Sequence, residues 1–149
     1  MESMRADSPR FSYAVAALER SIRRSLTGTL REFGLTVAQY TTLSLIRRRT
    51  GYSNAQLARR SFVSPQAMHE VISELQARGL LKRAQSSSHG TILLTYMTEA
   101  GRELLDRCDA AVDVMEQRML AELPEAWRAE IVRFLMEAAR KAEGPPTTE

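Results

Sequence analysis

The polar side chains between Pro65 and Arg78 are of types that form hydrogen bonds with the edges of DNA bases. Gln66, His69 and Ser73 fall at helical spacing on the side opposite an apolar stripe. Glutamine can pair with adenine through two hydrogen bonds, and histidine can donate to guanine. Short polar side chains allow a close approach to bases, so this face favours sequence readout. The alternative interpretation is an ordinary solvated helix face.

Basic side chains on both sides of this segment could neutralise phosphates. We expect Arg59, Arg60, Lys82 and Arg83 to hold the DNA backbone, with Ser86 and Thr91 as further backbone contacts. Between residues 20 and 91 there are twelve basic and three acidic residues, a net charge of +9, and the remainder carries −6. This asymmetry favours a polyanion-binding module on a separate scaffold, against a chance clustering of solvated arginines.

Other chemistry has little support in the sequence. Cys108 falls in line with apolar neighbours at helical spacing, so we expect a buried core thiol rather than a redox switch. Two histidines and one cysteine offer no metal-ligand spacing, and we expect no metal and no cofactor. No nucleophile–base set or glycine-rich phosphate loop is recognisable, so we expect no enzyme. No apolar run approaches the length of a membrane span, so no membrane partner is expected.

The elements that must position these residues are mostly helical, and the expected class is mostly α (α+β). Apolar residues at three- and four-residue spacing, with Ser, Thr, Pro and Gly at the ends, predict the helices. These are residues 9–33, a second helix from Thr36 to the basic run 47–49, a short one capped by Ser53, one from Pro65 to Arg78, and two more beginning at Thr98 and Pro124. Cations at a helix C-terminus are also a sufficient explanation for the basic run.

A β-hairpin is expected after the helix that ends at Gly79. Residues 80–84 and 91–96 are rich in apolar and β-branched types and flank a Ser/Gly-rich tip. Two helices joined by a short turn and followed by such a ribbon form a winged helix-turn-helix, in which the second helix enters the major groove.

The order and spacing of five segments resemble those of the MarR (multiple antibiotic resistance regulator) family. They are residues 34–43, 54–60, 64–68, 75–83 and 94–101, and the resemblance extends over about residues 9–141. It implies that residues 34–97 form the DNA-binding lobe and that residues 9–33 and 98–141 form a helical dimerisation region. It also implies DNA contacts from Ser53, Asn54, Ser64 and Ala67. The end segments themselves, residues 1–8 and 142–149, are expected to be flexible tails.

The tip of the expected wing departs from the family pattern. The family carries an Asp and an Arg there, and this sequence has His89 and Gly90 after a run of serines. Histidine can enter a narrow minor groove, so His89 is a candidate DNA contact. The alternative is a wing tip that is merely mobile.

Family members often bind small aromatic or anionic molecules between the scaffold and the lobe. The resemblance implies Tyr13, Arg20 and Tyr40 as polar contacts for such an effector, and each could equally be a packing or surface residue.

The leading hypothesis is therefore a cytoplasmic homodimeric repressor that reads a pseudo-palindromic operator in double-stranded DNA, with half-sites about 10 bp apart. One alternative is a winged-helix protein-interaction module with weakened DNA readout, favoured by the missing wing arginine and by Glu70 and Glu74. Another is a small-molecule-binding or resistance protein whose DNA role is secondary.

Overall fold

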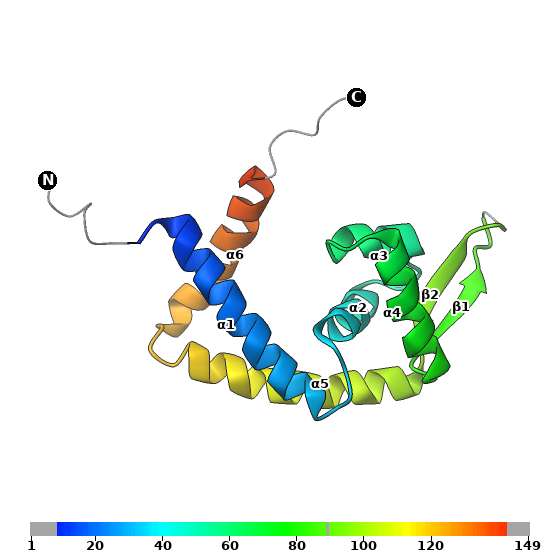
Figure 1. Cartoon of the computed structure of the whole chain (residues 1–149), viewed down its shortest axis with the longest axis horizontal. Coiled ribbons are helices and arrows are strands. Elements are labelled where there is room, and N and C mark those ends of the chain that lie inside the picture. Colours follow the sequence, from blue (N-terminus) through cyan, green and yellow to red (C-terminus); the bar gives the residue numbers. More distant parts are fainter. Residues whose placement is uncertain (1–8, 89, 143–149) are drawn as a thin grey trace, which may run out of the picture. The chain divides into compact units, whose positions relative to one another are not determined.

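The computed structural model describes residues 9–88 and 90–142, which form six helices and two strands (Figure 1). Their bounds are α1 Phe11–Arg31, α2 Val37–Arg48, α3 Asn54–Arg60, α4 Pro65–Ala77, β1 Leu81–Gln85, β2 Leu93–Met97, α5 Glu99–Met119 and α6 Glu125–Ala142. The predicted class, mostly helical with one small ribbon, is confirmed, and so is every expected element.

Side-chain caps set the starts of the three helices that build the winged lobe (residues 34–97). Thr36 and Ser53 each accept the backbone N–H of a glutamine three residues later, whose side-chain oxygen accepts the cap's own N–H. Ser64 caps α4, and Pro65 supplies the first turn. Gly79 follows α4 with φ +71°, a left-handed conformation that glycine adopts without steric cost.

The core of the lobe lies between α2, α3, α4 and the first half of α5. Met68, Ile72 and Leu75 of α4 are fully buried, as the apolar stripe of that helix predicts. Leu105 and Cys108 bring α5 into the same core with no exposed surface. The expectation of a buried core thiol is therefore confirmed, and burial raises the pKa of Cys108 although Arg107 and Arg78 lower it.

The two strands form an antiparallel ribbon in which Leu81 lies opposite Met97 and Gln85 opposite Leu93. Tyr52 extends the sheet by one bridge to Thr95, whose N–H donates to the Tyr52 carbonyl at 2.8 Å. The stretch between α2 and α3 is thereby fixed to the base of the wing.

Three polar links hold α2 against its neighbours. Gln39 Nε2 donates to Glu74 Oε2 of α4 at 2.7 Å. The Tyr40 hydroxyl donates to Asp109 Oδ1 of α5 at 2.7 Å. Arg47 forms ion pairs with Asp106 and Asp109, so α2 and α5 are joined by charge as well as by packing.

The start of α5 packs directly against the backbone that follows α4. The Thr98 hydroxyl donates to the Gly79 carbonyl at 2.6 Å and accepts the Gly101 N–H at 3.1 Å. A Cβ at position 101 would lie 2.3 Å from the Leu80 carbonyl oxygen. Only glycine fits there, so this residue sets how closely α5 approaches the wing.

The chain divides into two compact units, Met1–Val112 and Asp113–Glu149, and the boundary falls within α5. In the first unit, α1 buries only Leu30 and exposes Tyr13, Val15 and Leu18. In the second unit, α6 buries no residue at all. It exposes Trp127, Val132 and Met136, each by more than half of its surface.

Candidate nucleic-acid interface

The outer face of α4 is polar and open to solvent. Gln66, His69 and Ser73 are all exposed, on the side away from the buried stripe. Gln66 Nε2 lies 3.4 Å from Glu70 Oε1, a long hydrogen bond that leaves the amide able to exchange partners. The Ser73 hydroxyl donates its hydrogen to the His69 carbonyl at 2.8 Å, so towards a ligand the hydroxyl oxygen can only act as an acceptor. The three predicted base-reading residues therefore share one accessible face.

The residues at the starts of α3 and α4 have structural partners. The hydroxyls of Ser53 and Ser64 accept the N–H groups of Gln56 and Ala67 at 3.3 and 3.1 Å. Asn54 Nδ2 donates to the Pro65 carbonyl at 3.0 Å and so ties the start of α3 to the start of α4. The geometry gives these side chains a positioning role, and neither helix has an acidic residue in its first turn.

Lys82 and Arg83, both expected to hold phosphates, lie on opposite faces of the wing. Successive side chains of a strand point to opposite faces. Lys82 is exposed, whereas Arg83 lies on the face of Leu81 and Thr95 and is half-buried with its Nε enclosed. At the tip, the Ser88 N–H donates to the Ser86 hydroxyl at 3.3 Å, and Thr91 is exposed. His89 lies outside the described residues.

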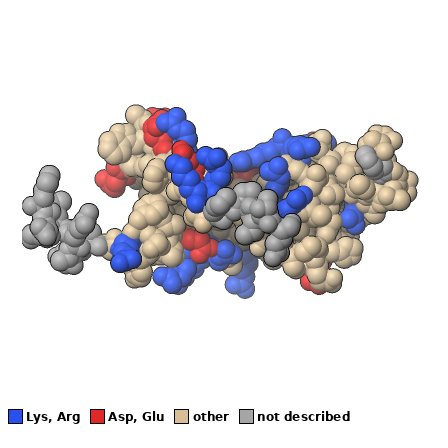
Figure 2. All heavy atoms as spheres, turned by 90° about the horizontal axis from the view of Figure 1, so that it is seen from above, with Lys and Arg blue, Asp and Glu red and all other residues tan. Residues whose placement is uncertain are grey.

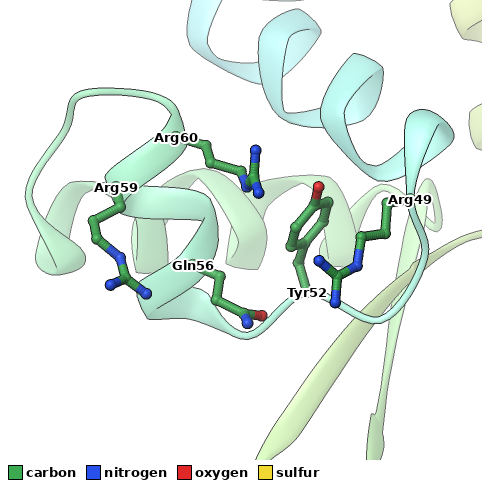
Figure 3. Close-up of a pocket in the computed structure, with 5 residues that line it drawn as sticks. All are labelled: Arg49, Tyr52, Gln56, Arg59 and Arg60. Carbon is green, nitrogen blue, oxygen red and sulfur yellow. The ribbon is translucent and has the colours of Figure 1, made fainter. Parts of the chain in front are cut away.

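A pocket of about 260 Å³ opens beside α3 and is lined by five residues (Figure 3): Arg49, Tyr52, Gln56, Arg59 and Arg60. The guanidinium carbons of Arg49 and Arg60 lie 5.5 and 5.4 Å from the centre of the Tyr52 ring, within cation–π range. Figure 2 shows Lys and Arg side chains gathered over this part of the lobe, with few acidic side chains among them.

Sequence reasoning found two of these five residues, Arg59 and Arg60, and missed the other three. The spacing of Gln56, Arg59 and Arg60 on one helical face was a usable signal. Arg49 and Tyr52 come from an extended stretch after α2, and their approach to α3 depends on the bridge between Tyr52 and Thr95.

The three residues expected to contact an effector have different surroundings. Tyr13 and Arg20 are exposed on α1. Tyr40 is half-buried in the contact between α2 and α5, where its hydroxyl is bonded to Asp109.

Within 9–88 and 90–142, no group of three or more His, Cys, Asp or Glu side chains could hold a metal ion. In the same ranges, no helix is long and apolar enough to cross a membrane.

Comparison with known proteins places this geometry in a family. Residues 33–90 match the model of the MarR family. The chain is 32% identical over 130 residues to the HTH-type transcriptional repressor Rv2887 of Mycobacterium tuberculosis, covering 87% of this chain and 94% of that one. The crystal structure of Rv2887 with salicylic acid matches with a TM-score of 0.71 over 89% of this chain and 98% of that one, at 32% identity. Its complex with DNA matches with a TM-score of 0.72 at 27% identity, over 88% and 98%. The resemblance seen in the sequence is confirmed, and the chain belongs to the MarR family of transcriptional regulators.

Proposed function

We propose that this chain is a transcriptional repressor that binds a pseudo-palindromic DNA operator as a homodimer and releases it when a small aromatic or anionic effector binds. The observation that carries the proposal is the division of α4 into a fully buried apolar face and an exposed face bearing Gln66, His69 and Ser73. In a winged helix-turn-helix this is the face that enters the major groove. Since its target is genomic DNA, we place the protein in the cytoplasm.

The proposed DNA contacts are those that the sequence predicts, and the exposure of the three α4 residues supports their part in it. Gln66, His69 and Ser73 read bases, and the four basic residues Arg59, Arg60, Lys82 and Arg83 hold phosphates. Further DNA contacts are proposed at the helix starts and in the wing, at Ser53, Asn54, Ser64, Ala67, Ser86 and Thr91. His89, which lies outside the described residues, is proposed to enter the minor groove. The mycobacterial relative has been solved in complex with DNA, which supports DNA as the partner of this chain.

Dimerisation is assigned to the outer helices, residues 9–33 and 98–141, and DNA binding to residues 34–97. Large apolar side chains exposed on one helix mark an interaction surface. Val15 and Leu18 of α1 and Trp127, Val132 and Met136 of α6 are such side chains. Two copies would present two α4 helices to successive major grooves, about one helical turn apart.

Effector control is proposed to act through the join between α2 and α5. The relative solved with salicylic acid supports an aromatic carboxylate as the class of effector. Tyr13, Arg20 and Tyr40 are the proposed contacts. An effector that takes the Tyr40 hydroxyl from Asp109 would loosen α2, which holds α4 through Gln39 and Glu74. It can act only if it binds the two arrangements with different affinity.

Selection of genomic fragments by the purified protein, followed by a salt titration on the best fragment, tests the proposal. An enriched pseudo-palindrome whose affinity falls steeply with salt is the expected result. Weak binding without an enriched sequence would overturn it and favour a winged-helix protein-interaction module. The exposed Glu70 beside Gln66 and the absence of arginine from the sequence of the wing tip motivate that second candidate.

A further inference from the structure

The pocket beside α3 concentrates positive charge in a concave site. Three of its five lining residues are arginines, and none of the five is acidic. Among the described residues, the ion pairs of the structure involve none of Arg49, Arg59 and Arg60. Like charges held close together repel, and a bound anion relieves that repulsion.

The walls of the pocket are held in place before any ligand arrives. Tyr52 is 4% exposed and is fixed through its backbone to Thr95 of the wing. The side-chain oxygen of Gln56 accepts the Ser53 N–H at 3.0 Å, which leaves the amide NH₂ as a donor for a ligand. Since the Tyr52 ring positions Arg49 and Arg60, little side-chain freedom is lost on binding.

Helix dipoles explain why arginines occur at these helix ends, but they do not explain why the arginines line one pocket. Arg59 and Arg60 lie in the last turn of α3, where cations are favoured. Arg49 is outside α2, in an extended conformation with φ −152°, and its guanidinium lies over the Tyr52 ring, which the guanidinium of Arg60 from α3 also approaches. The convergence therefore calls for a second explanation.

We propose that this pocket binds a compact dianion of the phosphate-monoester class. Three guanidinium groups match two negative charges better than the single charge of a DNA phosphodiester, and arginine forks suit phosphate oxygens. A volume of about 260 Å³ also leaves room for more than one phosphate group. Because Arg59 and Arg60 are also proposed to hold the DNA backbone, an occupied pocket would compete with the operator. That last consequence rests on the proposed function, and the binding itself does not.

Calorimetric titration with inorganic phosphate at about pH 8, where it is largely dianionic, tests the site directly. We expect saturable binding by the wild-type protein. Arg49→Gln should weaken this binding roughly 10- to 100-fold, the usual effect of losing hydrogen bonds from a charged donor. Arg48→Gln is the matched control, since Arg48 is the exposed last residue of α2, adjacent to Arg49 in the sequence, and does not line the pocket. Circular dichroism would verify that both variants are folded.

A second arm distinguishes a free dianion from a DNA phosphate as the natural occupant. Potassium phosphate should weaken duplex binding by the wild type more than potassium chloride at equal ionic strength, and Arg49→Gln should abolish the difference. The proposal is overturned if phosphate does not bind saturably, or if Arg48→Gln weakens it as much as Arg49→Gln does. It is also overturned if Arg49→Gln only lowers the salt slope of DNA binding, because the pocket would then bind a phosphate of the DNA backbone. A wild type that binds phosphate but no duplex would refute the repressor function and leave the pocket proposal standing.

Discussion

Phe62 occupies a backbone conformation that aromatic residues rarely adopt. It lies in the turn between α3 and α4 with φ +54°, and its side chain is 84% exposed. A bulky side chain in the left-handed region costs of order 1 kcal/mol, and little packing offsets that cost here. We expect Phe62→Gly to raise the free energy of unfolding by about 1 kcal/mol, measured by denaturant titration. Phe62→Ala is the control and should raise the free energy of unfolding by less, since alanine keeps a Cβ. A less stable glycine variant would contradict this view of the turn.

Gln66 stands at the first turn of α4 on the exposed face. Replacing it by alanine should weaken binding to the best operator by about 1–3 kcal/mol and relax specificity at one position, because a bidentate contact to a base is lost. Fluorescence anisotropy on a set of singly substituted operators measures both effects. Equal weakening on every sequence would assign Gln66 to the backbone instead.

At the scale of elements, the contact between α5 and the wing depends on a missing side chain. A methyl group at position 101 would meet the Leu80 carbonyl oxygen at 2.3 Å, and that oxygen also accepts the Thr98 N–H at 3.1 Å. Gly101→Ala should therefore destabilise the fold by about 1–3 kcal/mol, as overpacking does. Gly28→Ala is the opposite control, because a Cβ there meets nothing within 4 Å and alanine favours the helix. If thermal melts show that both substitutions change the melting temperature in the same direction, this explanation of Gly101 is wrong.

Lys82 and Arg83 lie on opposite faces of the wing, so they should differ in what they contribute to the stability of the fold. Lys82→Gln and Arg83→Gln should each lower the salt slope of DNA binding by about one, since each removes one of the phosphate contacts that we propose. Only Arg83→Gln should also lower the melting temperature, because Arg83 is half-buried and the shorter glutamine side chain would lose packing. An unchanged slope for Lys82→Gln would mean that its face of the ribbon points away from the duplex.

For the whole molecule, the exposed apolar side chains of α6 argue for a second copy of the chain. Trp127 is 63% exposed, so replacing it should cost the protomer little stability. We expect Trp127→Glu to shift the protein toward monomers in sedimentation experiments, because a charge would have to be buried in the interface. Operator affinity should fall with it, since two half-sites would no longer be bound together. A wild-type monomer would refute the assignment of the outer helices.

The sequence was sufficient for the elements and insufficient for parts of the site. Caps such as Ser53 and Ser64 and the buried stripe of α4 are local signals, so the helix positions could be predicted. The Arg49 and Tyr52 side of the pocket could not, because it forms where an irregular stretch meets a strand more than forty residues later. The partner of Tyr40 was likewise out of reach, since Asp109 is 69 residues away along the chain.

The helix caps of the lobe have a consequence for selection. The first four helices have no acidic residue in their first turns, whereas α5 and α6 begin with Glu99 and Glu125. Aspartate caps a helix as well as serine does and adds a favourable interaction with the dipole. A library of variants enriched for heat resistance alone would therefore accumulate aspartate at positions 53 and 64. Those variants would carry negative charge where we propose that DNA approaches, so they would be more heat-resistant and would bind DNA less well.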